Sequence, residues 1–219
     1  MTSPFFINLF SEVTAQSRYN HELVAAKEEF QRISGQIMDT DRSYDARVNA
    51  FHNWYILDRE LSDKNATPAK YFLEYNRNTF DADTLAGYAE LQENVHSVFQ
   101  LLKFKKDAMT IRDLMTNKKY NVEEANQLAT MEPGEVFNSR IFKHGKLYYL
   151  SNYVIVHPQE VVKSIRAEAK RWRKSKKSPK PFLFQLLFFH SRWEQFTQWD
   201  VRNIYRFDGE TSGATALQG

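Results

Sequence analysis

Apolar residues recur at every third or fourth position along the first part of the chain, which is the period of an amphipathic helix. Tyr44, Val48, Phe51 and Tyr55, for instance, occupy one face of a helix. Residues that cap a helix or suit its first turn precede these stripes, at Ser3-Pro4, Ser43, Thr67-Pro68 and Asp81 or Asp83. The pattern predicts about four helices over residues 1–96. Whether the first stripe forms one helix or two, broken near residues 17–20, stays open.

The pattern changes at residue 97, where short apolar runs rich in Val, Ile, Phe, Tyr and Leu replace the helical period. Polar turns separate the runs, among them one with Pro133-Gly134 and one with His144-Gly145. We predict five strands over residues 98–104, 109–114, 119–122, 136–142 and 147–153. Residues 97–156 therefore form a small antiparallel sheet or a partly open barrel, and residues 123–131 add one or two turns of helix.

Helical spacing returns in residues 157–207. The first helix there opens at His157-Pro158 and is dominated by charge up to Lys177, and the Ser-Pro-Lys-Pro sequence of residues 178–181 must end it. The second helix is aromatic nearly all round at its start, which predicts burial; its apolar residues are Phe182, Leu186, Phe189, Trp193 and Phe196, with Trp199 extending the face. The small polar tail, residues 208–219, is predicted to be disordered.

These elements define an α+β fold. An N-terminal helical region packs on a five-stranded antiparallel sheet or partly open barrel, and two C-terminal helices close it. The chain has 219 residues, of which 15% are aromatic, with only 7 Gly and 6 Pro. This composition argues against a fibrous or disordered protein and predicts an aromatic core.

Several function classes lose support from the composition. The chain has no cysteine, which excludes disulfides, thiolate metal sites and a cysteine nucleophile. The start of the chain lacks the features of a secretory signal. The longest apolar run, residues 182–189, is far shorter than the roughly 20 residues of a spanning helix. We expect a cytoplasmic protein with no membrane span.

The clearest functional feature is a segregation of charge. Residues 163–180 contain nine basic residues and one acid, a net charge of +8, which leaves −5 for the rest of a chain whose formal net charge is +3. Clustered lysine and arginine attract phosphate backbones, and Trp172 lies among them, where an indole could stack on a base. The candidate binding residues are Lys163, Arg166, Lys170, Arg171, Trp172, Arg173, Lys174, Lys176, Lys177 and Lys180, with Arg140, Lys143 and Lys146 around the last predicted hairpin.

Several short motifs also occur in a fixed order between residues 51 and 153. They are Phe51-His52-Asn53-Trp54-Tyr55-Ile56-Leu57-Asp58-Arg59, Thr67-Pro68, Ser97-Val98-Phe99-Gln100-Leu101, Ile111-Arg112-Asp113-Leu114-Met115-Thr116, Tyr120-Asn121-Val122 and Pro133-Gly134-Glu135. This order resembles a group of uncharacterised bacterial proteins with an F-x-N-W-[FY]-x-x-D-R segment and a T-P pair ahead of a small β region. The resemblance implies helices that lead into a small sheet, and it implies no reaction. Many members of the group carry a C-terminal, cysteine-rich SEC-C zinc motif, which is absent here.

The sequence shows no catalytic pattern, so we expect a protein that is not an enzyme. No histidine pair has the spacing of a metal site, and neither a phosphate-binding glycine loop nor a G-x-S-x-G elbow occurs. Asp58 and Arg59 follow an aromatic helix face, where an anchoring ion pair or a helix-end contact is the favoured interpretation over catalysis. We predict no cofactor and no metal.

Two functions are compatible with these patterns. The first is non-catalytic binding of RNA, DNA or another polyanion through the basic segment 163–180. The alternative is a protein-interaction adaptor, whose C-terminal helices dock an acidic protein partner.

Overall fold

Five strands form the β region of the computed structural model, which describes residues 4–16, 20–105, 108–123 and 130–207. Every predicted run is a strand. Their bounds are β1 (Val95–Lys105), β2 (Ala108–Asp113), β3 (Lys119–Glu123), β4 (Val136–His144) and β5 (Leu147–Val156). Alternate side chains point inward and fill the interior with apolar residues such as Phe99, Ile111, Phe137 and Leu150.

The strands close into a barrel in the order β1-β2-β3-β5-β4, because β4 also pairs with β1. The predictions of a purely antiparallel sheet and of a partly open barrel are both wrong. Four of the five pairings are antiparallel, whereas β3 and β5 run parallel over two residue pairs, Val122 with Tyr148 and Glu123 with Tyr149. The reason is one of parity. Directions cannot alternate all the way round a closed ring of five strands, so one pair must be parallel.

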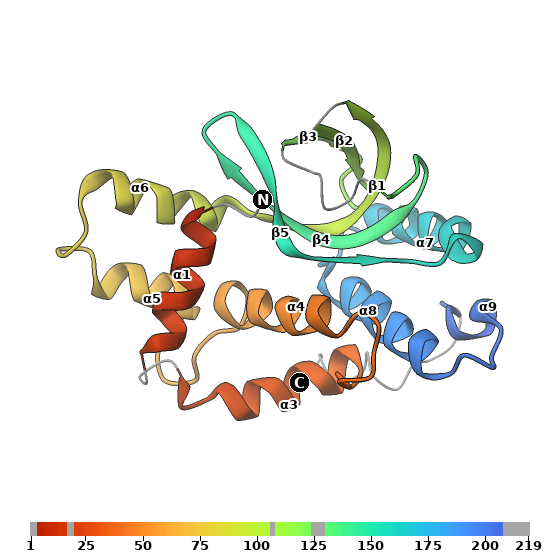
Figure 1. Cartoon of the computed structure of the whole chain (residues 1–219), viewed down its shortest axis with the longest axis horizontal. Coiled ribbons are helices and arrows are strands. Elements are labelled where there is room, and N and C mark those ends of the chain that lie inside the picture. Colours follow the sequence, from red (N-terminus) through yellow and green to blue (C-terminus); the bar gives the residue numbers. More distant parts are fainter. Residues whose placement is uncertain (1–3, 17–19, 106–107, 124–129, 208–219) are drawn as a thin grey trace.

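The N-terminal helices lie beside and below the barrel (Figure 1). They are α1 (Pro4–Ala15), α3 (Leu23–Ser34), α4 (Tyr44–Leu57), α5 (Pro68–Tyr75) and α6 (Ala82–Glu90), with a short 3₁₀ turn, η1 (Leu91–Glu93), leading into β1. The first apolar stripe is thus two helices. Thr67 and Asp81 cap α5 and α6 as predicted. Ser43 does not cap α4, because its hydroxyl donates instead to the Glu194 carboxylate.

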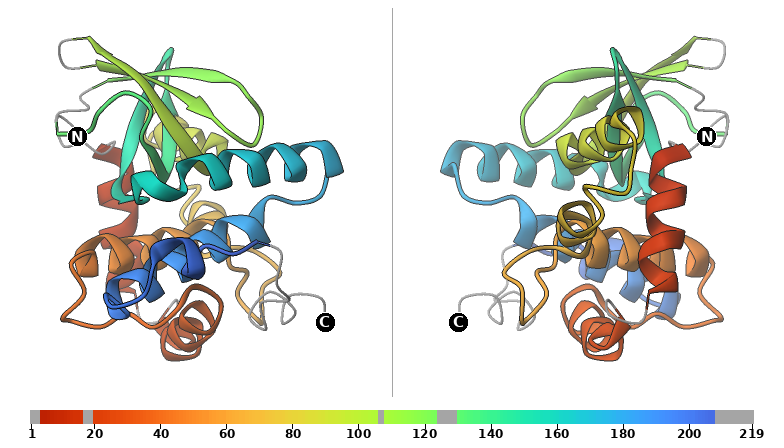
Figure 2. Two further views of the ribbon diagram at one scale, coloured as in Figure 1. Left: turned by 90° about the vertical axis from the view of Figure 1, so that its right-hand side faces the viewer. Right: turned by 90° about the vertical axis from the view of Figure 1, so that its left-hand side faces the viewer.

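The C-terminal helices join the barrel to the N-terminal helices. After a 3₁₀ turn, η3 (Gln159–Val161), come α7 (Val162–Ser175), α8 (Lys180–Gln195) and the short α9 (Val201–Ile204). Both views of Figure 2 show α7 between the barrel and α8. The predicted burial of α8 is confirmed, since Phe182, Leu183, Leu186 and Phe189 are buried. The predicted extension to Trp199 is wrong: α8 ends at Gln195, and Trp199 is 52% exposed.

Two sequence-based predictions fall largely or wholly outside the part of the chain that the structure describes. These are the helical turns within residues 123–131 and the disordered tail at 208–219. Among the described residues, no helix combines the length and apolar character needed to cross a lipid bilayer.

A buried ion pair ties α4 to the barrel. The Arg140 side chain, on β4, is 2% exposed and donates hydrogen bonds to the Asp58 carboxylate just past α4 and to the Asn94 side chain. Burial alone would raise the pKa of Asp58, but the Arg140 guanidinium, together with the charges of His96 and Lys180, outweighs it and holds that pKa below its usual value. His96 lies 3.9 Å from the same carboxylate, and burial together with Arg140 lowers its pKa to about 3.

We expect replacement of Asp58 by asparagine to lower the free energy of unfolding by about 3–5 kcal/mol at pH 7, because Arg140 would remain buried without a counter-charge. Urea denaturation measures the difference. The control is Asp63→Asn, which removes an exposed carboxylate paired with Lys64 and should leave the stability nearly unchanged, because water screens exposed pairs.

The difference in unfolding free energy between wild type and Asp58→Asn should depend on pH. Because folding depresses the pKa of Asp58, its stabilising contribution is complete above the unfolded value of about 3.9 and is lost as the pH falls through the native pKa. The gap between wild type and Asp58→Asn should therefore narrow on acidification below about pH 4. A gap that stays constant with pH would show that the Asp58 charge does not stabilise the fold.

Candidate functional site

A narrow apolar stripe fixes the rotation of α7 about its own axis. Val162, Ile165 and Ala169 are buried and Trp172 is half-buried, at successive spacings of three, four and three residues. They pack in one cluster with residues of the barrel wall and of α8, including Val98, Leu114, Val136, Phe182 and Leu186. Of the other α7 residues, Glu168 at the edge of the stripe is also buried, and the remaining positions of α7 are set relative to the stripe.

The cations of α7 divide into groups around that stripe. Lys163, Arg166, Lys170 and Arg173 each follow a stripe residue by one position, which is a turn of about 100° around the helix. They therefore form a row along one flank of the stripe, about 15 Å long at 1.5 Å per residue. We call these four residues the cationic row.

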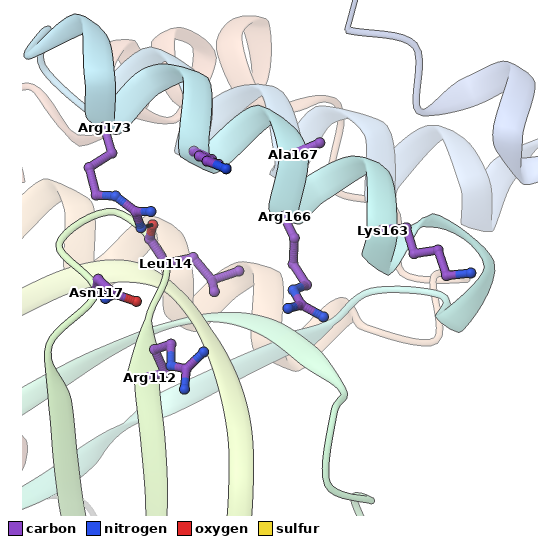
Figure 3. A pocket seen from close by; sticks show the side chains of 8 residues that line it. Arg112, Leu114, Asn117, Lys163, Arg166, Ala167 and Arg173 are labelled. Atoms are coloured by element: carbon purple, nitrogen blue, oxygen red, sulfur yellow. Dashed lines mark hydrogen bonds between the residues drawn. The ribbon is translucent and has the colours of Figure 1, made fainter.

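The cationic row lines a groove between α7 and the end of β2 (Figure 3). The groove has a volume of about 330 Å³. Its opposite wall is formed by Arg112 and Leu114 at the end of β2 and by Asn117 in the turn to β3, and Ala167 adds a small apolar surface on the helix side. The lining thus combines five basic side chains with two apolar residues and one amide, and contains no acid.

A buried carboxylate shapes the wall opposite the helix. Asp113 is 1% exposed, and its Oδ1 accepts hydrogen bonds from the Ser97 hydroxyl at 2.5 Å and from the Met115 amide at 2.8 Å. Its Oδ2 accepts from the Thr116 hydroxyl at 2.5 Å. These bonds hold the turn in which Asn117 takes a left-handed conformation (φ 64°), which asparagine tolerates better than most residues.

One arginine of the row joins the two walls. The guanidinium of Arg173 donates to the Leu114 carbonyl oxygen at 2.9 Å. The spacing between α7 and the turn is therefore set by a hydrogen bond near the C-terminal end of the helix and by the apolar cluster along its length.

Basic and polar residues continue outward from the groove over the barrel surface. Lys119 of β3 lies directly opposite Arg112 in the strand pairing, so both side chains emerge on the same face of the sheet. Lys103 pairs with Thr110, whose hydroxyl donates to the Asn121 side chain. Lys119 of β3 and Lys103 of β1 thus add positive charge on the barrel surface beside the groove.

The other cations of the basic segment lie outside the groove. Arg171 forms an ion pair with Glu168, and it lines a second hollow of about 230 Å³ with Glu168, Trp172, Ser175 and Lys177. Lys174 is exposed, and Lys176 ends α7 in a left-handed conformation. Lys180, the first residue of α8, acts electrostatically on the Asp58 and His96 side chains and lowers the pKa of both.

The three basic residues predicted around the last hairpin do not join the groove. Arg140 is buried in its ion pair with Asp58, which corrects its assignment as a surface contact for a polyanion. Lys143 pairs with Glu93 at 3.2 Å, and Lys146 is exposed at the hairpin turn. That hairpin tip and α7 lie at opposite ends of the barrel (Figure 1). The pairing of Asp58 also confirms that it anchors the fold.

Trp172 is less available than a base-stacking role requires. Its indole stacks on the Phe182 ring, with ring centroids 6.0 Å apart and an interplanar angle of 23°. One aromatic face is therefore covered by α8, and the side chain anchors α7 to the core.

Sequence reasoning missed Arg112 and Asn117, which form the wall opposite the helix. Both lie within or beside the short motifs of the β region, but nothing in their local pattern relates them to residues about 50 positions later. The cationic row had a usable signal. The apolar spacing of three, four and three is repeated, one residue later, by four basic residues.

One group of side chains has the composition of a cation site. Ligand atoms of His21, Glu22 and Asp63 lie within 4.8 Å of one another. The Glu22 carboxylate already accepts hydrogen bonds from the amide and hydroxyl of Ser62 and from Arg59. Burial raises the pKa of Glu22, but those bonds outweigh it and lower the pKa to about 2. The ion pair with Arg59 and the two hydrogen bonds from Ser62 explain its position without a metal ion.

Comparison with known proteins gives a family without an assigned activity. The model of a family described as "Family of unknown function (DUF7986)" matches residues 9–191, so the chain belongs to this family. No curated protein and no solved structure matches the chain. The matched region includes the barrel, the whole of α7 and most of α8.

We expect Asp113→Ala to loosen the groove wall, because the Met115 amide and two hydroxyls would lose their common acceptor. The free energy of unfolding should fall by about 2–3 kcal/mol, and hydrogen exchange of the Met115 amide should accelerate. The control is Asn121→Ala, which removes an exposed hydrogen bond on β3 and should leave both quantities nearly unchanged. Unchanged exchange at Met115 would contradict the role given to Asp113.

Proposed function

We propose that the protein is a non-catalytic binding protein that holds a polyanion, with nucleic acid preferred, in the groove between α7 and β2. The observation that carries the proposal is the gathering of Arg112, Lys163, Arg166, Lys170 and Arg173 around one hollow whose lining includes no acid. Like charges held close together repel, and a bound anion relieves that repulsion.

Binding, as opposed to catalysis, fits the chemistry of the groove. Its lining contains no carboxylate or imidazole that could act as a general base. What it offers is positive charge, hydrogen-bond donors and a small apolar surface. These groups suit a phosphate backbone, whose neutralisation releases condensed counterions.

A second candidate is a protein-interaction adaptor, and an exposed aromatic surface beyond α8 favours it. The rings of Phe196 and Trp199 lie 5.7 Å apart, and Trp199 is 52% exposed. The Arg192 guanidinium covers the Phe196 ring at 4.6 Å. Exposed tryptophan and arginine are enriched where proteins bind one another. This surface is separate from the groove, and an acidic protein partner fits the arginine at its edge.

We expect Lys163→Glu combined with Lys170→Glu to abolish most binding of a labelled oligonucleotide, because the change reverses two charges of the cationic row. The matched control is Lys174→Glu combined with Lys177→Glu, which changes the net charge equally on the same segment but outside the groove. Fluorescence anisotropy at low salt measures both. Equal loss in the two variants would place the interface elsewhere, and no binding by the wild type would sink the proposal.

Wild-type binding should also weaken steeply with salt. For single strands, the logarithm of the association constant falls with the logarithm of salt concentration at a slope of about −0.7 per phosphate contact. Four or five contacts in the groove therefore give a slope of roughly −3. A slope near zero would mean that the observed binding is not held by phosphates.

A further inference from the structure

Two unpaired arginines face each other across the groove. In Figure 3 the guanidinium groups of Arg112 and Arg166 extend into the same space from opposite walls, whereas Lys163 points away along the helix. Arg173 is already committed to the Leu114 carbonyl. Within the described part of the chain, neither Arg112 nor Arg166 has a hydrogen-bond or ion-pair partner for its side chain.

Two arginines in this arrangement suit the binding of one phosphodiester group at a defined position. A guanidinium is a planar fork whose N–H groups match the oxygens of a phosphate, often in pairs. Two forks that approach from opposite walls can share the non-bridging oxygens of one phosphate. An anion between them would also supply the counter-charge that the lining residues lack.

The rest of the lining matches the part of a nucleotide that is not phosphate. Ala167 offers an exposed methyl group, the edge of Leu114 (7% exposed) adds a small apolar surface, and the exposed Asn117 side chain offers both a donor and an acceptor. A base has an apolar face and polar edges. Inorganic polyphosphate has neither, so it would leave this part of the groove unused.

The size of the groove favours a single strand over a duplex. Its volume of about 330 Å³ is at the lower end of the roughly 300–1,000 Å³ range for ligand pockets. In a duplex the bases are stacked and paired inside the helix, and the two walls of the groove would keep so wide a cylinder outside. A duplex would rest on the rim and contact only outward cations such as Lys163.

We infer that the groove seats one nucleotide of a single-stranded nucleic acid, with its phosphate between Arg112 and Arg166 and its base against Leu114, Ala167 and Asn117. This inference rests on the proposed function and specifies its ligand. Neighbouring nucleotides follow the cationic row along α7 in one direction and extend toward Lys119 of β3 and Lys103 of β1 in the other. Among the described residues no side chain pairs with the guanidinium of Arg112 or Arg166, so both can take a partner from a ligand.

The first experiment compares ligands on the intact protein. Anisotropy titrations use labelled single strands of RNA and of DNA of roughly 12 nucleotides, with unlabelled duplex of the same sequence and inorganic polyphosphate as competitors. We expect either single strand to bind at least tenfold more tightly than the duplex and the polyphosphate. Equal or tighter binding of the duplex or the polyphosphate would overturn the inference and leave the proposed function standing. Absence of binding to every polyanion would overturn both.

The second experiment removes the arginine that only the structure associates with the groove. Arg112→Gln should weaken single-strand binding on the order of tenfold and reduce the salt slope by about one contact, with little effect on the residual duplex binding. Arg112→Lys should recover part of the loss. The control is Arg77→Gln, an exposed arginine between α5 and α6 at the other side of the molecule (Figure 1). An equal effect of Arg112→Gln and Arg77→Gln would contradict the phosphate position.

The third experiment fills the base position without changing charge. Ala167→Leu places a larger apolar side chain on an exposed position of α7, where leucine supports the helix well. Single strand and duplex should then bind with about equal affinity, and the binding should still weaken with salt. Retention of the full preference, with unchanged circular dichroism and thermal unfolding, would show that the base does not enter the groove.

Discussion

The packing of one narrow stripe of α7 against the barrel determines where the charge of this protein lies. Val162, Ile165 and Ala169 pack against the barrel wall and the start of α8, and the Trp172 indole stacks on the Phe182 ring. Burial of each larger apolar side chain is worth about 1.5–3 kcal/mol, so other rotations of the helix are strongly disfavoured. The cationic row follows the stripe one residue later and must therefore border β2. The position of the candidate binding surface thus follows from an apolar contact that includes none of its charges.

Pairing, and not the amount of positive charge, separates structural cations from candidate binding residues. Arg140 is buried against Asp58, and Arg47 is 1% exposed and donates to the carbonyl oxygens of Leu187, Ser34 and Gly35. Both guanidinium groups hold elements together, and a ligand cannot reach them. The groove differs, because Arg112 and Arg166 line an open hollow and the described residues that line it include no carboxylate. A buried charge requires a partner within the fold, whereas an accessible unpaired charge can take one from outside.

Features that depend on residues close together in the sequence could be predicted, and features that depend on distant residues could not. Strands and helices were predictable because their periods are local, and the burial of α8 followed from its aromatic residues on every side. The parallel pairing of β3 with β5 was not, because it depends on the closure of the ring, to which every strand contributes. Arg140 and Arg166 look alike in sequence, yet one lies opposite Asp58 and the other opposite Arg112. That difference comes from which distant segment each arginine faces, and no local pattern contains it.

The distribution of charge over the whole molecule bears on how a nucleic acid would approach. Residues 60–93, which include α5 and α6, contain seven acids and three bases, and these helices lie at the other side of the molecule from α7 (Figure 1). A polyanion would therefore be attracted toward the groove and repelled from the opposite end. Such a charge distribution would orient the protein as it meets a nucleic acid. It would also limit the length of strand that one molecule can cover, since a strand that continued beyond the barrel would meet acidic helices. A short footprint centred on the groove is the geometry that both the local lining and the overall field favour.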